Sequence, residues 1–200
     1  MRILAFGDSF MLGAGDPYHL GWIGRTVLGR PDVTLYNLGV RGDTSSDIVA
    51  RWRREASNRM GTDEPLRLVF SFGCNDCALD EEGDLRVAPS DTLKNTQRIL
   101  AEAATLCPVL LVGPPPVPDP LQMVRIASVG DALRIVATQL RVPYIDVFTA
   151  LRQSGVWEAE AAAGDGAHPG ADGYQQMADL VMTHPAWRAF AGDERSVQAH

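Results

Sequence analysis

Five short runs of apolar residues recur along the 200 residues of the chain, separated by longer and more polar segments. Each run is nearly continuous and does not alternate between apolar and polar positions. Continuous apolar runs of this length are typical of strands that are buried on both faces of a parallel sheet. The sequence predicts strands at Ile3–Phe6, Val33–Leu38, Leu66–Phe72, Val109–Val112 and Tyr144–Phe148.

The segments between these runs carry apolar residues at three- and four-residue spacing, as an α-helix with one buried face requires. Ser90 is predicted as an N-cap, because its hydroxyl can accept a hydrogen bond from a free N–H of the first helical turn. The predicted helices cover residues 21–28, 45–56, 90–106, 121–140 and 173–182, with one more helical segment after the fifth strand and a short helix after His184.

The alternation of strands with helices predicts a doubly wound α/β sheet with right-handed crossovers. No shift of composition and no internal repeat divides the chain. We therefore expect a single domain over residues 1–191, followed by a polar tail over residues 192–200. The proline-rich stretch "GPPPVPDP" at 113–120 follows directly on a predicted strand, which favours a rigid loop beside the sheet over a polyproline ligand.

Composition and charge narrow the function classes. With 46% hydrophobic and 22% charged residues, the chain has the composition of an ordinary globular protein. A formal net charge of −7 argues against general nucleic-acid binding, and the basic stretch at 51–59 is interpreted as the solvated face of a helix. No apolar run approaches the ~18 residues that span a bilayer, and the first strand leaves no room for a signal peptide. We expect a cytoplasmic protein without stable membrane insertion.

The cysteines do not indicate a disulfide scaffold or a metal site. Cys74 and Cys77 form a C-x-x-C pair, but a structural zinc site needs a second pair and Cys107 stands alone. The residues after Cys77 read as a loop, whereas a redox pair of this kind opens a helix. We therefore predict neither a metal nor a redox role for these residues.

Polar motifs follow four of the predicted elements, where the carboxyl ends of parallel strands form one edge of the sheet. Functional groups gather at this edge in open α/β sheets. The motifs are "GDS" at 7–9, "NLGVRGDTSSD" at 37–47, "GCND" at 73–76 and "GDGAHPGADGY" at 164–174. All four are expected to converge on one site.

Two functions compete for the glycine-containing turn at 7–9. A P-loop needs a lysine followed by Ser or Thr, and this turn has neither; the dinucleotide pattern G-x-G-x-x-G is also absent. A flavodoxin-like FMN site remains an alternative, since it needs only backbone N–H groups after the first strand. Such a site would leave the other three motifs without a role, whereas a nucleophilic serine uses all four.

The residue types in these motifs match those of acyl transfer. Ser9 is the candidate nucleophile, His168 the base that accepts its proton, and Asp165 the carboxylate that orients the imidazole ring. Asp165 lies three residues before His168 in a glycine-rich turn, within reach of the ring. The backbone N–H of Gly42 and the side-chain amide of Asn75 are candidate donors to an oxyanion.

At these residues the sequence resembles the SGNH hydrolases, also called the GDSL family of esterases and lipases. The resemblance extends from Arg2 to about Val181, and Phe10 replaces the leucine of the name-giving motif. It implies a flavodoxin-like three-layer α/β/α fold with a five-stranded parallel sheet. It also implies hydrolysis of small-molecule esters or thioesters through an acyl-enzyme, without metal or cofactor. In such a site the backbone N–H of Ser9 is a further donor to the oxyanion. The family's four named residues and its acid match Ser9, Gly42, Asn75, His168 and Asp165.

The resemblance does not select a substrate, because the family acts on lipids, acyl thioesters and acetylated sugars. The short loops of a 200-residue chain favour an open groove for short acyl groups. Arg41 is interpreted as solvent-facing, with contact to an anionic leaving group as the alternative. A catalytically inactive binding protein on the same fold also remains an alternative.

Overall fold

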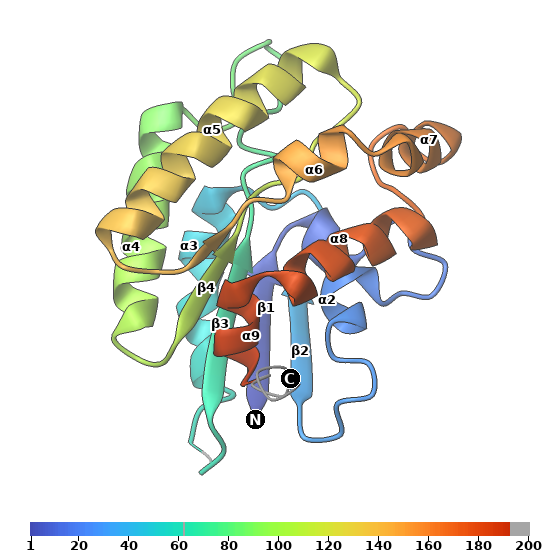
Figure 1. Cartoon of the computed structure of the whole chain (residues 1–200). Coiled ribbons are helices and arrows are strands. Elements are labelled where there is room, and N and C mark those ends of the chain that lie inside the picture. Colours follow the sequence, from blue (N-terminus) through green and yellow to red (C-terminus); the bar gives the residue numbers. More distant parts are fainter. Residues whose placement is uncertain (62, 193–200) are drawn as a thin grey trace.

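The computed structural model describes residues 1–61 and 63–192. Within these residues five parallel strands form one sheet in the order β2-β1-β3-β4-β5 (Figure 1). This is the flavodoxin-like order, so the predicted fold class is confirmed. The strands are β1 (Arg2–Gly7), β2 (Thr34–Gly39), β3 (Leu66–Ser71), β4 (Val109–Val112) and β5 (Tyr144–Ile145). The polar tail predicted at 192–200 lies, except for Gly192, outside the described residues.

Helices cover both faces of the sheet and complete three layers (Figure 1). One face is covered by α3 (Ser45–Ser57), α4 (Pro89–Ala104) and α5 (Pro120–Gln139), which pack in that order. The other face carries α2 (Gly21–Arg25), α8 (Ala171–Thr183) and α9 (Pro185–Ala191). Short helices lie at the carboxyl ends of the strands: α1 (Ser9–Leu12), α6 (Phe148–Arg152) and α7 (Gly155–Ala163).

The central strands are buried on both faces, as their continuous apolar runs predict. Phe6 of β1 stacks on Phe70 of β3 with ring centroids 5.5 Å apart, and Trp52 of α3 meets Phe70 edge-on at 5.7 Å. Each such buried aromatic side chain contributes about 2–3 kcal/mol through the area it removes from water. The edge strand β2 is only partly buried, because it has a neighbour on one side alone.

Two local predictions are wrong. The fifth strand ends at Ile145, since the Asp146 carboxylate accepts the N–H of Phe148 at 2.9 Å and the chain turns into α6. Ser90 is not an N-cap: α4 begins one residue earlier at Pro89, after Ala88. Proline is favoured at the first helical position, because its fixed φ suits a helix and its missing N–H has no partner there.

Arg51 is mostly buried, unlike Arg53 and Arg54, which lie on the solvated helix face predicted for residues 51–59. Its Nη2 donates to the carbonyls of Gly7 (3.1 Å) and Leu38 (2.9 Å), and its Nε donates to Asp43 at 2.6 Å. The guanidinium therefore satisfies carbonyl groups at the ends of β1 and β2. It fixes the two strand ends from which the polar motifs begin.

Candidate active site

The turn after β1 places Ser9 at the start of a helix. A Cβ on Gly7 would lie 2.3 Å from the Ser71 carbonyl oxygen and 2.6 Å from Met11 Cβ, so the close approach requires glycine. Asp8 is the N-cap of α1, and its carboxylate accepts the Phe10 N–H at 2.9 Å. Ser9 is the first helical residue, and its own N–H has no partner within the helix.

Ser9, His168 and Asp165 form a continuous hydrogen-bonded chain. The Ser9 hydroxyl donates to His168 Nε2 at 2.7 Å, and His168 Nδ1–H donates to Asp165 Oδ2 at 2.8 Å. The other carboxylate oxygen, Oδ1, accepts the backbone N–H groups of Ala167 (3.0 Å) and His168 (2.9 Å). The carboxylate is thus fixed against its own loop, with one oxygen directed at the imidazole. The structure brings together the three residues that the sequence predicted as nucleophile, base and orienting carboxylate.

The imidazole ring is held from several sides. Its centroid lies 4.8 Å from that of Phe10, and the His168 side chain is only 8% exposed. Gly15 backs the histidine loop so closely that a Cβ there would lie 2.6 Å from the Pro169 carbonyl oxygen. Phe10 in turn stacks on Trp157 of α7. The ring is therefore oriented by packing as well as by Asp165.

Asp165 is stabilised in its ionised form. Burial alone would raise its pKa, but hydrogen bonds from the His168 backbone, the His168 ring, the Ala167 backbone and Arg41 lower it well below the usual range. Arg41 Nη2 lies 3.0 Å from Asp165 Oδ2. Arg41 is exposed to solvent, as predicted. Its guanidinium also forms an ion pair with the Asp165 carboxylate, which the sequence did not predict.

The candidate oxyanion donors lie on two adjacent loops. Val40–Asp43 forms a turn closed by the Asp43 N–H to the Val40 carbonyl, and Gly42 has φ +84° at the position where a type II turn needs glycine. No atom lies within 4 Å of a Cβ built on Gly42, so the approach is open. Asn75 Nδ2 donates to the Asp43 carbonyl at 2.9 Å, which ties the loop after β3 to this turn.

Asp76 connects these loops to two helices. The sequence alone did not predict a role for it. It is 1% exposed and accepts the Ser45 N–H at 2.9 Å, the Ser45 hydroxyl and the Thr92 hydroxyl at 2.9 Å. One carboxylate therefore joins the loop that carries Asn75 to the first turns of α3 and α4. The only signal in the sequence was the position of Asp76 directly after Asn75, and its partners come from distant segments.

Asp8 is a buried carboxylate that forms no salt bridge with a cation of residues 1–61 and 63–192. Burial raises its pKa to about 7, helped by the charges of Asp76 and Asp43, while the hydrogen bond from the Phe10 N–H opposes the rise. Because the folded pKa lies above the unfolded value of 3.8, ionisation of Asp8 opposes folding. Its destabilising effect grows as the pH rises from about 4 to about 7.

We expect Asp8→Asn to remove this pH dependence while the amide oxygen retains the N-cap bond. Between pH 4 and pH 8 the free energy of unfolding of the variant should rise relative to wild type by roughly 2–4 kcal/mol. Urea unfolding at several pH values in this interval measures the difference. Parallel stability curves for the two proteins would contradict the raised pKa of Asp8.

The cysteines are free thiols, and the C-x-x-C pair is buried. The Cys74 Sγ–H donates to the Pro115 carbonyl at 3.3 Å, and burial raises its pKa well above the ordinary value. Burial likewise raises the pKa of Cys77 to about 12. Both residues are therefore protonated at neutral pH and poor nucleophiles. Residues 1–61 and 63–192 contain no group of three His, Cys, Asp or Glu side chains placed to hold a metal ion.

A parallel α/β sheet with a serine–histidine–aspartate chain at its carboxyl edge defines the serine hydrolases of this architecture. The model of the GDSL-like lipase/acylhydrolase family matches residues 5–176, and the chain belongs to that family. It is a serine ester hydrolase.

No helix in the described part of the chain is long and apolar enough to cross a bilayer.

Solved structures with the same fold are numerous, and no curated protein sequence matches the chain. A lipase/acylhydrolase from Enterococcus faecalis is 24% identical with a TM-score of 0.74, covering 90% of this chain and 93% of the other. A member of the lipolytic G-D-S-L family from Veillonella parvula is 22% identical (TM-score 0.72; 91% and 96%). An acetylxylan esterase from Geobacillus stearothermophilus is 18% identical (0.71; 90% and 91%). At these identities the likeness shows the fold.

Proposed function

We propose that the protein hydrolyses short-chain esters through an acyl-enzyme formed on Ser9. The observation that carries the proposal is the hydrogen-bonded chain from Ser9 Oγ through His168 to Asp165, at 2.7 and 2.8 Å. A serine hydroxyl is a weak nucleophile until a base takes its proton, and this chain supplies the base and its orienting carboxylate.

The reaction proceeds in two transfers. Ser9 Oγ attacks the ester carbonyl carbon while His168 Nε2 takes the hydroxyl proton. The resulting oxyanion accepts hydrogen bonds from the N–H groups of Ser9 and Gly42 and from the Asn75 amide. The alcohol leaves with the proton held by His168. Water then attacks the acyl-enzyme, again giving a proton to His168, which returns it to Ser9 Oγ as the carboxylic acid departs.

The charge around the turn supports a nucleophile over a phosphate or flavin site. Asp8 already caps α1, so a phosphate at this helix start would displace the Asp8 carboxylate or lie against it. Arg51 already binds strand-end carbonyls and Asp43. A catalytically inactive binding protein would have no use for an imidazole held between a serine hydroxyl and a carboxylate.

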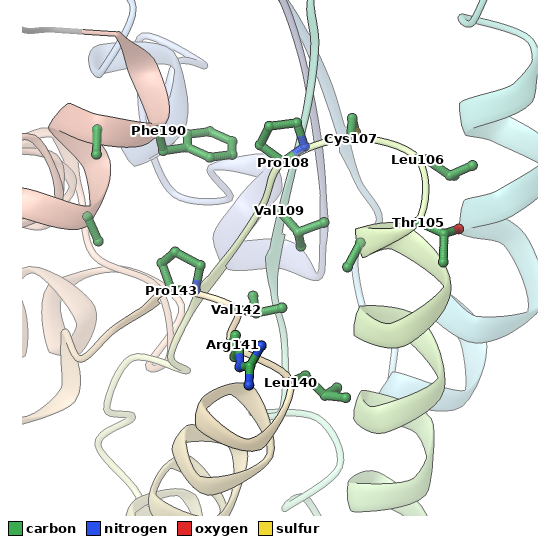
Figure 2. Close-up of a pocket in the computed structure, with 13 residues that line it drawn as sticks. Thr105, Leu106, Cys107, Pro108, Val109, Leu140, Arg141, Val142, Pro143 and Phe190 are labelled. Carbon is green, nitrogen blue, oxygen red and sulfur yellow. The ribbon is translucent and has the colours of Figure 1, made fainter.

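Short acyl groups are supported by the packing beside His168. Phe10 and Trp157 are 4% and 2% exposed and stack with centroids 6.2 Å apart, which fills the space next to the ring. A cavity of about 650 Å³ lies at the opposite edge of the sheet, at the start of β4 and between α4, α5 and α9 (Figure 2). Ser9 follows the carboxyl end of β1, at the other end of the strands, so this cavity does not adjoin the candidate active site. The acetylxylan esterase among the similar structures makes acetylated sugars natural candidates, beside short-chain thioesters and lipids.

A series of p-nitrophenyl esters tests the preference. We expect kcat/KM to fall by at least about tenfold from the acetyl to the octanoyl ester, because a longer chain finds no room beside the buried aromatic rings. Acetylated xylooligosaccharides and acetyl thioesters in the same assay identify the leaving group. A higher kcat/KM for octanoyl than for acetyl esters would overturn the short-acyl proposal, and Ser9→Ala controls for background hydrolysis.

A further inference from the structure

Arg41 connects the two loops on which the proposed chemistry depends. It stands directly before Gly42 in the turn at 40–43, and its guanidinium reaches the loop before α8. There Nη2 donates to Asp165 Oδ2 at 3.0 Å, the same oxygen that accepts His168 Nδ1–H at 2.8 Å. The cation and the imidazole ring therefore lie on one carboxylate oxygen, within about 6 Å of each other. No assignment in the family pattern gives Arg41 a role.

Arg41 is two hydrogen bonds away from the His168 ring, through Asp165 Oδ2. The other charged or titratable groups around the histidine either are acidic or are engaged elsewhere. Asp16 is bound by Arg25, Glu160 accepts the N–H groups of Gly170 and Gly173, and the Tyr174 hydroxyl donates to the Ala14 carbonyl. Asp8 lies beneath Ser9 and caps α1. Of the charged groups named here, Arg41 is the cation that shares a carboxylate oxygen with the imidazole ring.

We propose that the positive charge of Arg41 partly offsets the nearby carboxylates, which favour protonation of His168. His168 therefore stays unprotonated, and active as a base, at a lower pH than it would without Arg41. The inference rests on the proposed role of His168 as the base. A positive charge beside Asp165 opposes the gain of a second positive charge on the imidazole. Arg41 and the imidazole ring also share Oδ2 as their hydrogen-bond acceptor. Arg41 is then a residue that tunes the base through Asp165 and does not touch the substrate.

The position of the pair determines how large and how salt-dependent the effect is. The side chains of Arg41 and Asp165 are 62% and 39% exposed, so water screens the pair. Two unit charges about 5–6 Å apart in a medium close to water shift a titration by about half a pH unit. At 0.5 M salt the Debye length falls to about 4 Å, and most of this effect should disappear.

The test is an NMR titration of the imidazole ring in the free protein, which does not require a substrate. In Arg41→Gln we expect the titration midpoint of His168 to rise by about half a pH unit at low salt. Arg41→Lys keeps the charge and should restore most of the wild-type value. At 0.5 M NaCl the difference between the midpoints of wild type and Arg41→Gln should shrink to a small part of its low-salt value, because salt screens the charge of Arg41. Signals of His19 and His184 serve as internal references.

Arg86→Gln is the matched control. Arg86 Nη2 donates to the Gly42 carbonyl at 2.8 Å, on the same turn, whereas the guanidinium paired with Asp165 is that of Arg41. In Arg86→Gln the titration midpoint of His168 should stay within about a fifth of a pH unit of the wild-type value. An unchanged or lower midpoint in Arg41→Gln, or an equal rise in Arg86→Gln, overturns the proposal.

Activity separates this inference from the proposed function. If the protein hydrolyses esters, the acid limb of kcat/KM should move to higher pH in Arg41→Gln by the same half unit. If the NMR midpoint moves and no short-chain ester is hydrolysed, the tuning by Arg41 stands and the proposed function fails. If esters are hydrolysed and neither the midpoint nor the limb moves, the function stands and the tuning fails.

Discussion

Ser9→Ala is expected to lower ester hydrolysis by roughly 10⁴- to 10⁶-fold while leaving the fold intact. The hydroxyl that donates to His168 at 2.7 Å is the only serine hydroxyl bound to a histidine among the described residues, so no neighbouring group can replace it. The variant loses a single oxygen atom from a 5% exposed side chain, and alanine suits a helical position. The loss should therefore appear in activity and not in stability.

A fluorophosphonate probe with mass-spectrometric mapping measures the same prediction directly. The probe should label Ser9 in wild type and nothing in Ser9→Ala. Ser46→Ala is the matched control: Ser46 is an exposed serine in another of the edge motifs, bound by the Asn95 amide at 3.0 Å and not by a histidine. Its labelling and activity should equal those of wild type. An adduct on another residue, or full activity in Ser9→Ala, would end the acyl-enzyme mechanism.

The placement of the site could be predicted because strand ends and motifs coincide in the sequence. A parallel sheet puts the carboxyl ends of its strands at one edge, so "GDS" after β1 and "GCND" after β3 must be neighbours. His168 and Asp165 come from the loop before α8, far along the chain. Their convergence on Ser9 followed from the types of chemical group needed and not from their distance in sequence.

Pairings between distant polar residues could not be predicted. The contacts of Arg41 with Asp165 and of Asp76 with Ser45 and Thr92 depend on how loops from different strands meet. Charge patterning assigns such residues to solvent by default, and this default also misplaced Arg51. Burial at the carboxyl edge decides otherwise, since strand-end carbonyls and loop N–H groups there need partners.

The end of β5 and the start of α4 show the same limit at short range. An apolar run predicted a strand through Phe148, but the Asp146 side chain offers the backbone a competing turn. Ser90 has the right side chain for an N-cap, but the proline before it starts the helix earlier. In both cases a neighbouring residue with a stronger local preference moved the boundary, while the element itself was predicted correctly.

Asn75→Ala is expected to lower kcat by about 10²- to 10³-fold with little change in KM, the usual effect of removing one donor to an oxyanion. The amide group carries two N–H donors. One is occupied by the Asp43 carbonyl at 2.9 Å, which fixes the side chain in place before substrate binds. The other is available to an oxyanion whose negative charge develops only in the transition state. Stabilisation confined to the transition state appears in kcat and not in KM.

The same substitution also removes a contact between two loops, so a control must separate that loss from the loss of the oxyanion donor. Asn95→Ala serves this purpose, because the Asn95 amide donates to the hydroxyls of Ser45 and Ser46 at 3.0 Å and likewise ties α4 to the start of α3. It should keep kcat within about threefold of wild type. Steady-state kinetics on the acetyl ester and thermal unfolding of both variants give the comparison.

A change confined to KM in Asn75→Ala would assign Asn75 to substrate positioning. An equal loss of kcat in Asn95→Ala would attribute the effect to the loops. Only a kcat loss specific to Asn75, at a melting temperature shared by the two variants, is consistent with direct stabilisation of the oxyanion.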